Sequence, residues 1–170
     1  RLAKTPFTTP STEHRRYRGV SHNLSDYKTV KTALGGTIND VVLTTVAGAI
    51  GKFLLRRRIE LSGAFRTVVP VSVRGADERG VPGNRVSVWL TALPVEEPDA
   101  RRRLAAVRAL TLQLKDDQDA MGAEIVSQAA EWTTANVIKL AAQVINYARC
   151  FNLIVTNVPG PPVPFCLLDA

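Results

Sequence analysis

The sequence has few of the residues that usually build catalytic and metal-binding sites. It contains two cysteines and two histidines among 170 residues. Cys150 and Cys166 lack metal-ligand spacing and have no histidine beside them, so we expect no bound metal and no redox pair. Neither His14 nor His22 stands in a pattern typical of a general base or a catalytic triad, which predicts ordinary packed or exposed histidines. Sparse use of cysteine fits a reducing compartment.

Several longer signals are missing as well. No signal peptide is visible in the sequence, and no GxSxG, Walker-loop or GxGxxG sequence occurs in it. No uninterrupted apolar run reaches the roughly 18 residues needed to span a bilayer, and the apolar stretch over residues 153–168 is broken by four prolines. The sequence therefore predicts a soluble chain, or at most a peripheral one.

Apolar residues and positive charge are plentiful. Apolar residues make up 45 % of the chain, which is enough for one domain with a real core. The formal net charge is +7, which suits an anionic partner such as nucleic acid, an acidic membrane surface or a phosphorylated cofactor. Composition alone leaves these three open.

Hydrophobic periodicity predicts helices alternating with strands. The clearest helix has Thr37 as N-cap and Asp40 as the second half of a capping box, and residues 41–50 carry no charge, so we expect most of its surface to be covered. Gly35 and Gly36 stop the helix before it. We expect an extended linker over residues 1–13, strands over 20–24, 65–73, 84–95 and 151–155, and helices over 26–34, 99–114 and 123–148. The helix that Thr37 caps is expected to end in the arginine run at 56–58. The predicted fold class is α/β, a mixed β-sheet packed with helices.

Two segments combine polar residues with a structural reason to lie near a ligand. Asn39 and Asp40 stand in the first turn of an otherwise apolar helix, where they either complete the cap or face a cleft and orient a catalytic group supplied from elsewhere. A rigid turn follows the last strand and consists of Asn157, Val158, Pro159, Gly160 and Pro161. This turn is either a tight surface connection or a backbone segment that approaches a ligand.

Arginine clusters form the remaining candidates. Residues 56–58 and 101–103 are runs of arginine, and such runs usually mark solvated helix faces. Arg74 follows directly on a predicted strand, and is either solvated in the same way or placed to bind a phosphate.

Four short strings occur along the chain in a particular order. They are GGTINDVVL at residues 35–43, VPVSVR at 69–74, GNR at 83–85 and TNVPGP at 156–161. Each string is weak alone, but the ordered set resembles the bacterial wax ester synthase/diacylglycerol acyltransferase (WS/DGAT) family. The similarity covers almost the whole chain.

The resemblance implies a fold and a mechanism. The chain would form one half of a two-domain, coenzyme-A-dependent acyltransferase fold similar to chloramphenicol acetyltransferase, with the active site in a tunnel between two similar halves. In such an enzyme the first half contains an HHxxxDG motif, whose second histidine takes a proton from the hydroxyl of a fatty alcohol or a diacylglycerol. The resulting oxygen attacks the acyl-CoA thioester directly, without a covalent acyl-enzyme.

This sequence departs from the family pattern because HHxxxDG is absent, and His14 and His22 do not match it. We therefore expect no catalytic residue in this chain and a general base in an N-terminal half located before Arg1. Residues 14–170 would form the C-terminal domain, incomplete at its own end.

Site residues are carried over from the resemblance by position. Asn39 and Asp40 match the family's Asn-Asp pair, which implies support of the site from the second domain. The turn over residues 157–161 matches the segment that lines the substrate and CoA tunnel. Arg74 and Asn84 also match motif positions and are assigned to this tunnel.

The expected function is acyl-CoA-dependent O-acyl transfer that makes triacylglycerol or wax esters, with acyl-CoA as co-substrate and no permanently bound cofactor. Expected partners are the N-terminal half, the diacylglycerol or fatty alcohol, and a membrane or lipid-droplet surface. The expected location is cytoplasmic, with the inner membrane or lipid inclusions as peripheral sites. One alternative is a condensation-type acyltransferase that uses carrier-protein thioesters. Another is a non-catalytic basic binding module, which we rank last because no aromatic-plus-basic surface suggests nucleic acid.

Overall fold

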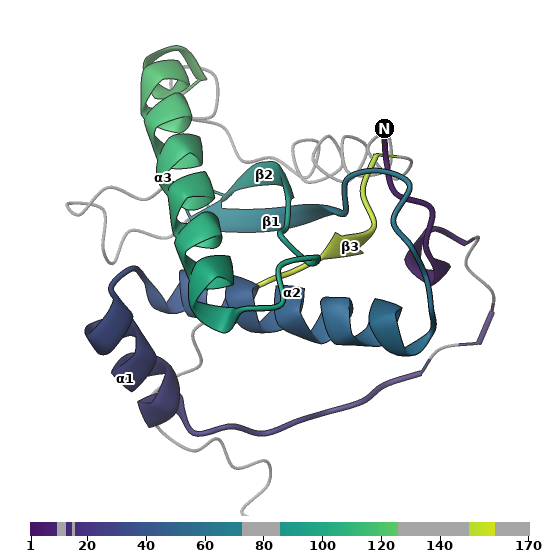
Figure 1. Ribbon diagram of the computed structural model, residues 1–170. Coiled ribbons are helices and arrows are strands. Elements are labelled where there is room, and N and C mark those ends of the chain that lie inside the picture. The colour runs from purple at the N-terminus through teal and green to yellow at the C-terminus, as the bar shows by residue number, and fades with distance from the viewer. Residues whose placement is uncertain (10–12, 15, 73–85, 126–149, 159–170) are drawn as a thin grey trace, which may run out of the picture.

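A small β-sheet lies against long helices in the part of the chain that the structure describes. The computed structural model describes residues 1–9, 13–14, 16–72, 86–125 and 150–158. The elements are η1 (Pro6–Thr8), α1 (Leu24–Leu34), α2 (Ile38–Arg56), β1 (Arg66–Ser72), β2 (Val86–Ala92), α3 (Ala100–Ile125) and β3 (Leu153–Ile154). The core forms where α2 and α3 meet the sheet, and α1 lies beside the start of α2 (Figure 1). A mixed sheet packed with helices, as predicted, is confirmed.

The sheet has the strand order β2-β1-β3 and contains both kinds of pairing. β1 runs antiparallel to β2, from the pair Arg66 and Ala92 to the pair Ser72 and Val86. β3 runs parallel to β1 and is short, with Leu153 beside Thr67. The predicted strands over 65–73, 84–95 and 151–155 thus exist and are shorter in the described residues.

Pro70 interrupts pairing on one side of β1. The N–H of Leu93 donates to the carbonyl of Phe65 on the β2 side, whereas the N–H of Val155 donates to the carbonyl of Val68 on the β3 side. Successive residues of a strand direct their backbone groups to opposite sides, so the nitrogen of Pro70 lies on the β3 side and has no hydrogen to donate. The ladder between β1 and β3 accordingly ends at Val68 and Ile154.

The predicted strand over residues 20–24 is wrong. No strand forms there, the side chain of Val20 is 81 % exposed, and Leu24 begins α1. A strand needs a partner for its backbone groups, and five residues with one valine and one leucine gave no indication of a partner. The predicted helix over 26–34 is confirmed, and it begins two residues earlier than expected.

Local sequence explains the bounds of α2. Thr37 accepts a hydrogen bond from the backbone N–H of Asp40, and the Asp40 carboxylate accepts one from the backbone N–H of Thr37, which completes the capping box. The helix ends at Arg56, and Arg58 follows with a positive φ of 54°. The predicted start after Thr37 is confirmed, and the helix ends within the arginine run at 56–58 as expected.

α2 is long and apolar enough to cross a membrane, judged by length and composition alone. The expectation of a soluble or peripheral chain, drawn from the lack of a long uninterrupted apolar run, stays a prediction, since α2 itself contains Asp40, Lys52 and Arg56. In the structure, 39 % of its most apolar window is buried. A single such helix is also what the core helix of a water-soluble domain looks like.

One face of the sheet forms the core together with α2 and α3. Val69 of β1 and Trp89 of β2 are cross-strand partners, and Phe65 and Leu93, just outside the two strands, lie on the same face because side chains alternate along paired strands. The buried cluster consists of Leu43, Ala47, Leu54, Phe65, Val69, Trp89, Leu93, Val95, Val107 and Val155. Each large side chain in it contributes about 1.5–3 kcal/mol through burial.

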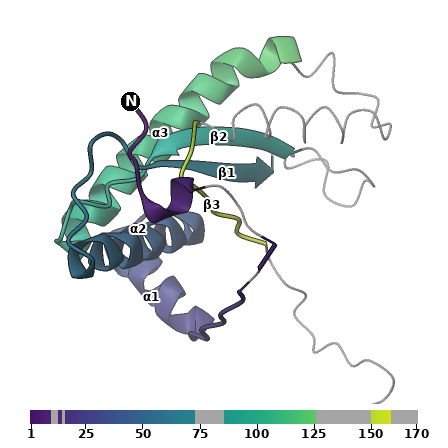
Figure 2. The same cartoon turned by 90° about the vertical axis from the view of Figure 1, so that its right-hand side faces the viewer.

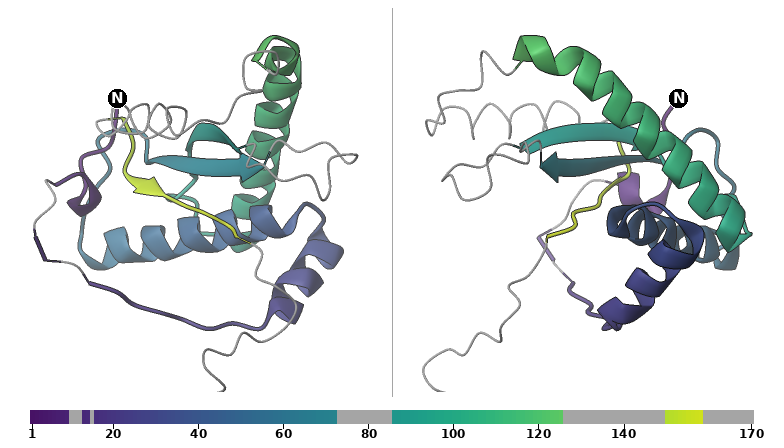
Figure 3. Two further views of the ribbon diagram at one scale, coloured as in Figure 1. Left: turned by 180° about the vertical axis from the view of Figure 1, so that it is seen from behind. Right: turned by 90° about the vertical axis from the view of Figure 1, so that its left-hand side faces the viewer.

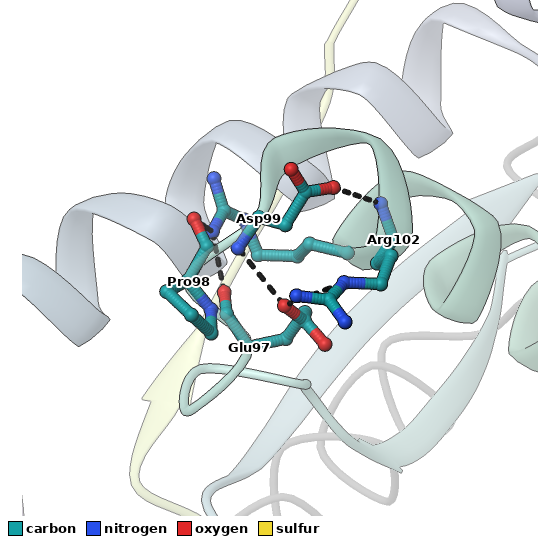
Figure 4. A network of polar contacts seen from close by, with 5 residues as sticks. Glu97, Pro98, Asp99 and Arg102 are labelled. Atoms are coloured by element: carbon teal, nitrogen blue, oxygen red, sulfur yellow. Dashed lines mark hydrogen bonds and ion pairs between the residues drawn. The ribbon is translucent and has the colours of Figure 1, made fainter.

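A compact polar network starts α3 (Figure 4). The carboxylate of Asp99 accepts a 2.8 Å hydrogen bond from the backbone N–H of Arg102, which lowers the pKa of Asp99 below its usual 3.8. Glu97 accepts a hydrogen bond from the N–H of Asp99 at 2.9 Å and lies 3.5 Å from the guanidinium of Arg102. The predicted start of this helix is confirmed, and Leu104 and Val107 form its buried stripe.

Residues 1–9 pack against the domain, whereas the sequence indicated an extended linker. Ala3 is fully buried, and its N–H donates to the carbonyl of Ala64. The side chain of Asn152 holds this segment, because it donates to the carbonyl of Ala3 at 2.8 Å and to the hydroxyl of Thr5 at 3.2 Å. It also accepts a hydrogen bond from the N–H of Arg66 at 2.9 Å. The linker expectation failed because this docking depends on a residue far away in the sequence.

Some predicted features lie outside the described residues. α3 extends to Ile125, so the predicted helix over 123–148 is described only at its first residues. Arg74, Asn84, Pro159, Gly160 and Pro161 also lie outside the described ranges.

Candidate functional site

The junction between α1 and α2 is a tight turn built on two glycines. Gly35 and Gly36 have φ values of 76° and 93°, which side chains rarely permit. A methyl group on Gly36 would lie 3.0 Å from both the side chain of Arg108 and the carboxylate of Asp40. Both glycines are therefore needed for the backbone turn, and Gly36 also for close packing.

Asp40 uses both carboxylate oxygens in structural contacts. Oδ2 accepts from the backbone N–H of Thr37 at 2.7 Å and from its hydroxyl at 2.9 Å. Oδ1 accepts a 2.8 Å hydrogen bond from the hydroxyl of Thr111 on α3. With 4 % exposure, Asp40 thus ties α3 to the first turn of α2. This geometry supports the cap interpretation of Asp40, and any role in the site would be that of a positioning residue.

Asn39 differs from its neighbour. It is partly exposed, and its side chain makes no hydrogen bond to any residue that the structure describes. Asn39 therefore keeps its amide available at the start of α2. Its assignment to the site stays a prediction.

Arg108 lies over the glycine pair and was not singled out by sequence. Its guanidinium donates a 2.7 Å hydrogen bond to the carbonyl of Leu34, at the C-terminal end of α1. A cation is favourable there because the helix dipole is negative at that end. The methyl position of Gly35 would meet the same guanidinium at 3.1 Å. Sequence indicated only a polar helix face for this residue, and nothing local could have shown its contact with α1.

Arg103 corrects the expectation for the cluster at 101–103. Arg101 and Arg102 are exposed as predicted, but Arg103 is half-buried and reaches across α2. It donates to the carbonyls of Thr44 at 3.2 Å and Glu97 at 2.6 Å. Gly48 makes room for it, because a methyl group there would lie 2.5 Å from the guanidinium. Arg103 therefore joins α2 to α3 rather than facing solvent.

The chain leaves the sheet after Val155 and passes across α2 (Figure 3). Asn157 is exposed and Val158 is 80 % exposed, so this part of the predicted turn projects from the body. Within the described residues, neither side chain is hydrogen-bonded to Asn39 or Asp40. The tunnel assignment of the turn stays a prediction.

In the described part of the chain, neither histidine lies in a buried site and no cluster of residues is placed to bind a metal ion. His14 and His22 are both exposed, and the ring of His22 packs edge-on against Tyr27 at a centroid distance of 6.3 Å. No group of three or more His, Cys, Asp or Glu residues is gathered as metal ligands among the described residues. Cys150 is a free thiol and Cys166 lies beyond the described ranges.

Two family models match the chain, each over a different part. Residues 82–170 match the model described as "WS/DGAT C-terminal domain", and residues 1–42 match the "Wax ester synthase/diacylglycerol acyltransferase catalytic domain". The second match ends inside α2, whose later residues share a core with β1 and β2. The models thus divide a single packed unit, and the domain division that we predict at residue 14 stays a prediction.

Three proteins of Mycobacterium tuberculosis illustrate the similarity to known proteins. Each is named "Putative diacyglycerol O-acyltransferase". Their identities to this chain are 30 %, 32 % and 32 %, over 92 %, 92 % and 94 % of its length. The same alignments cover 32 %, 35 % and 35 % of the relatives, so the chain spans about a third of their length. No solved structure is significantly similar to the chain.

The matching C-terminal model extends over more than half of the chain, and the resemblance found in the four ordered strings is confirmed. The chain therefore belongs to the wax ester synthase/diacylglycerol acyltransferase family.

Proposed function

We propose that this chain is the second-domain part of an acyl-CoA-dependent O-acyltransferase that makes triacylglycerol or wax esters. The single observation that carries the proposal is the ordered match of the catalytic-domain and C-terminal-domain models to one chain. The names of the M. tuberculosis relatives agree with O-acyl transfer to diacylglycerol. The complete fold would be the two-domain arrangement similar to chloramphenicol acetyltransferase.

The reaction would transfer an acyl group from the sulfur of acyl-CoA to the oxygen of an acceptor alcohol. A histidine of the N-terminal half would take the proton of the acceptor hydroxyl, and the oxygen would attack the thioester carbonyl carbon of acyl-CoA. The carbon–sulfur bond would break, and the protonated histidine would give the proton to the CoA thiolate. Because His14 and His22 are exposed and lie outside any HHxxxDG sequence, this chain alone should be inactive.

The described residues would support and line the site. Asp40 fixes the first turn of α2 through Thr37 and Thr111, which leaves the amide of Asn39 to meet substrate or the N-terminal half. Asn157 and Val158 project from the sheet, as a segment that lines a shared tunnel would. The net charge of +7 would favour the phosphates of CoA and an anionic lipid surface. We expect a cytoplasmic enzyme with peripheral contact to the inner membrane or lipid inclusions.

The test is to express the complete open reading frame that encodes this chain and to assay it with labelled acyl-CoA. Diacylglycerol and a long-chain fatty alcohol are supplied separately as acceptors, and the products are triacylglycerol and wax ester. The 170-residue chain alone is the control and should form neither product. Absence of both products from the complete protein, with no HHxxxDG encoded upstream, would refute the proposal.

Asn39 provides a sharper variant in the same assay. Asn39→Ala should lower product formation about 10-fold or more, in the range seen when a residue that orients a catalytic group is removed. The matched control is Gln113→Ala, an exposed amide on α3. Both variants should keep the wild-type melting temperature within about 2 °C, since surface substitutions usually change stability by less than 0.5 kcal/mol. Unchanged activity of Asn39→Ala would show that Asn39 is not part of the site.

A further inference from the structure

Thr111 occupies a position of α3 where an apolar residue is expected. It is 3 % exposed and continues the buried stripe formed by Leu104 and Val107. Its hydroxyl lies 2.8 Å from Oδ1 of Asp40 and 3.2 Å from the carbonyl of Arg108 in its own helix. A hydroxyl has one hydrogen to donate, and the shorter bond to a charged acceptor is the stronger of the two. The polar group of Thr111 is therefore directed to α2.

The capping box of α2 does not require this bond. Oδ2 of Asp40 accepts from the N–H of Thr37 at 2.7 Å, and the hydroxyl of Thr37 accepts from the N–H of Asp40 at 3.2 Å. Among the described residues, Thr111 is the only hydrogen-bond donor to Oδ1 of Asp40. The bond from Thr111 therefore fixes where the capped turn lies relative to α3.

Arg108 holds the other side of the same junction. It lies one helical turn before Thr111, and its guanidinium donates to the carbonyl of Leu34 at 2.7 Å. α3 thus contacts the last residue of α1 and the first turn of α2, and it crosses α2 close to the junction between them (Figures 1 and 2). Because Arg108 keeps the end of α1 in place, loss of the Thr111 bond should loosen the first turn of α2 without unfolding the junction.

Asn39 takes its position from this turn. Its side chain makes no hydrogen bond to any described residue, so no polar contact of its own fixes the amide. Its backbone runs between Thr37 and Asp40, which are bonded to each other and, through Asp40, to Thr111. A shift of the capped turn against α3 would carry the amide of Asn39 with it.

We propose that Thr111 is a positioning residue, which holds Asn39 in place by fixing Asp40. This inference rests on the proposed function, because it takes Asn39 as part of the acyltransferase site. Thr111 lies outside the four ordered strings and inside the match to the C-terminal-domain model, whereas Asn39 and Asp40 lie inside the match to the catalytic-domain model. A residue of one matched region thus sets the geometry of an Asn-Asp pair in the other.

Steady-state kinetics of the complete open reading frame test the proposal, with labelled acyl-CoA and an acceptor alcohol. Thr111→Val removes the hydroxyl and keeps the shape of the side chain, and Thr111→Ser keeps the hydroxyl. Thr111→Val is also combined with Asn39→Ala, because residues that act through one another give non-additive effects. The matched control is Thr44→Val, since Thr44 is also buried and its hydroxyl donates to the carbonyl of Asp40 within α2 itself.

Thr111→Val should lower kcat/KM about 5-fold or more when Asn39 is present, and less than about 2-fold when Asn39 is already alanine. Thr111→Ser and Thr44→Val should both stay within about 2-fold of wild type. Full activity of Thr111→Val or of Asn39→Ala would overturn the proposal. Equal losses in both backgrounds, an equal loss in Thr44→Val, or a Thr111→Ser variant as impaired as Thr111→Val would overturn it as well.

Hydrogen exchange of the complete protein separates this inference from the proposed function, because it is read without substrate. Deuterium uptake over residues 35–43 should be faster in Thr111→Val than in wild type and unchanged in Thr44→Val. A protein that forms no product but shows this difference would refute the proposed function and leave Thr111 as the residue that holds the turn. Uptake equal to wild type in Thr111→Val would overturn the inference, whatever the activity.

Discussion

The hydroxyl of Thr111 donates a 2.8 Å hydrogen bond to Oδ1 of Asp40, and this bond joins α3 to the first turn of α2 across 71 residues of sequence. Both groups are buried, so neither can exchange its partner for bulk water. The cap of one helix and the packing of another therefore depend on the same carboxylate.

Removal of that carboxylate should be costly. Asp40→Ala loses the capping box and the buried hydrogen bond from Thr111, whose hydroxyl keeps only a 3.2 Å contact with the carbonyl of Arg108, and we expect a loss of about 2–4 kcal/mol in the free energy of unfolding. Thr111→Val should cost less, because it leaves the capping box intact. Urea denaturation of the 170-residue chain measures both. A loss for Asp40→Ala no larger than for Thr111→Val would show that the cap adds nothing.

Gly36 should resist substitution far more than Gly19. Gly36→Ala places a methyl group on a residue with φ of 93° and 3.0 Å from Arg108 and Asp40, so we expect a loss of about 1–3 kcal/mol. Gly19→Ala is the control, because its methyl group would meet only the flexible, exposed ring of Tyr17 at 3.4 Å. Thermal denaturation compares the two. Equal melting temperatures would contradict the backbone conformation described for Gly36.

Asn152 should be required for docking of the first residues. Asn152→Ala leaves the N–H of Arg66 and the carbonyl of Ala3 without their partner, which should cost about 2–4 kcal/mol. Hydrogen exchange provides the specific readout, because the N–H of Ala3 should exchange faster in the variant. Thr9→Ala, at an exposed hydroxyl in the same segment, should leave that exchange unchanged.

Two threonines should be replaceable with a gain in stability. Thr67 and Thr91 are cross-strand neighbours on the core face, and their buried hydroxyls have no hydrogen-bond partner among the described residues. Valine has nearly the same shape and no hydroxyl to desolvate, so Thr67→Val and Thr91→Val should each stabilise the chain by about 1 kcal/mol. Chemical denaturation measures the change. Destabilisation by both would indicate that a bound water or ligand satisfies these hydroxyls.

Acid should weaken the start of α3 through Asp99. The N–H of Arg102 lowers the pKa of this carboxyl below 3.8, so the unfolded chain binds its proton more readily than the folded one. The contribution is fully present above the unfolded pKa and is lost as pH falls through the lower folded pKa. The difference in stability between wild type and Asp99→Asn should thus be constant above about pH 5 and shrink below about pH 4. A stability difference for Asp99→Asn that stays constant down to pH 3 would contradict the hydrogen bond from Arg102 to Asp99.

Short-range features of this fold could be predicted from sequence, and long-range ones could not. Thr37 and Asp40 are three residues apart, so their capping box was visible as a pattern. Arg103, Arg108 and Asn152 bind groups 59, 74 and 149 residues away, and no local pattern indicates such partners. For the same reason the packing of residues 1–9 was missed. Their contacts depend on a strand near the other end of the chain.

The candidate site shows the same division. Motif matching identified Asn39 and Asp40, but only the structure separates a buried carboxylate with every contact used from a partly exposed amide with none among the described residues. The expectation that α2 is covered on most sides followed from its lack of charge. The exposed Thr45 and Ala49 show where the described chain does not supply that cover.

Pro70 fixes the residue at which the chain leaves the sheet after β3. Asn152, directly before β3, is hydrogen-bonded to β1, and the N–H of Val155, directly after β3, donates the last hydrogen bond to β1. The missing N–H of Pro70 prevents further pairing, so the chain leaves the sheet at a defined residue. Asn157 follows only two residues beyond this release point. An insertion between Asn152 and Asn157 would therefore change how far the turn extends from the sheet, and the strand cannot absorb it by further pairing. The position of Pro70 in β1 thus determines how far the residues after β3 can extend from the sheet.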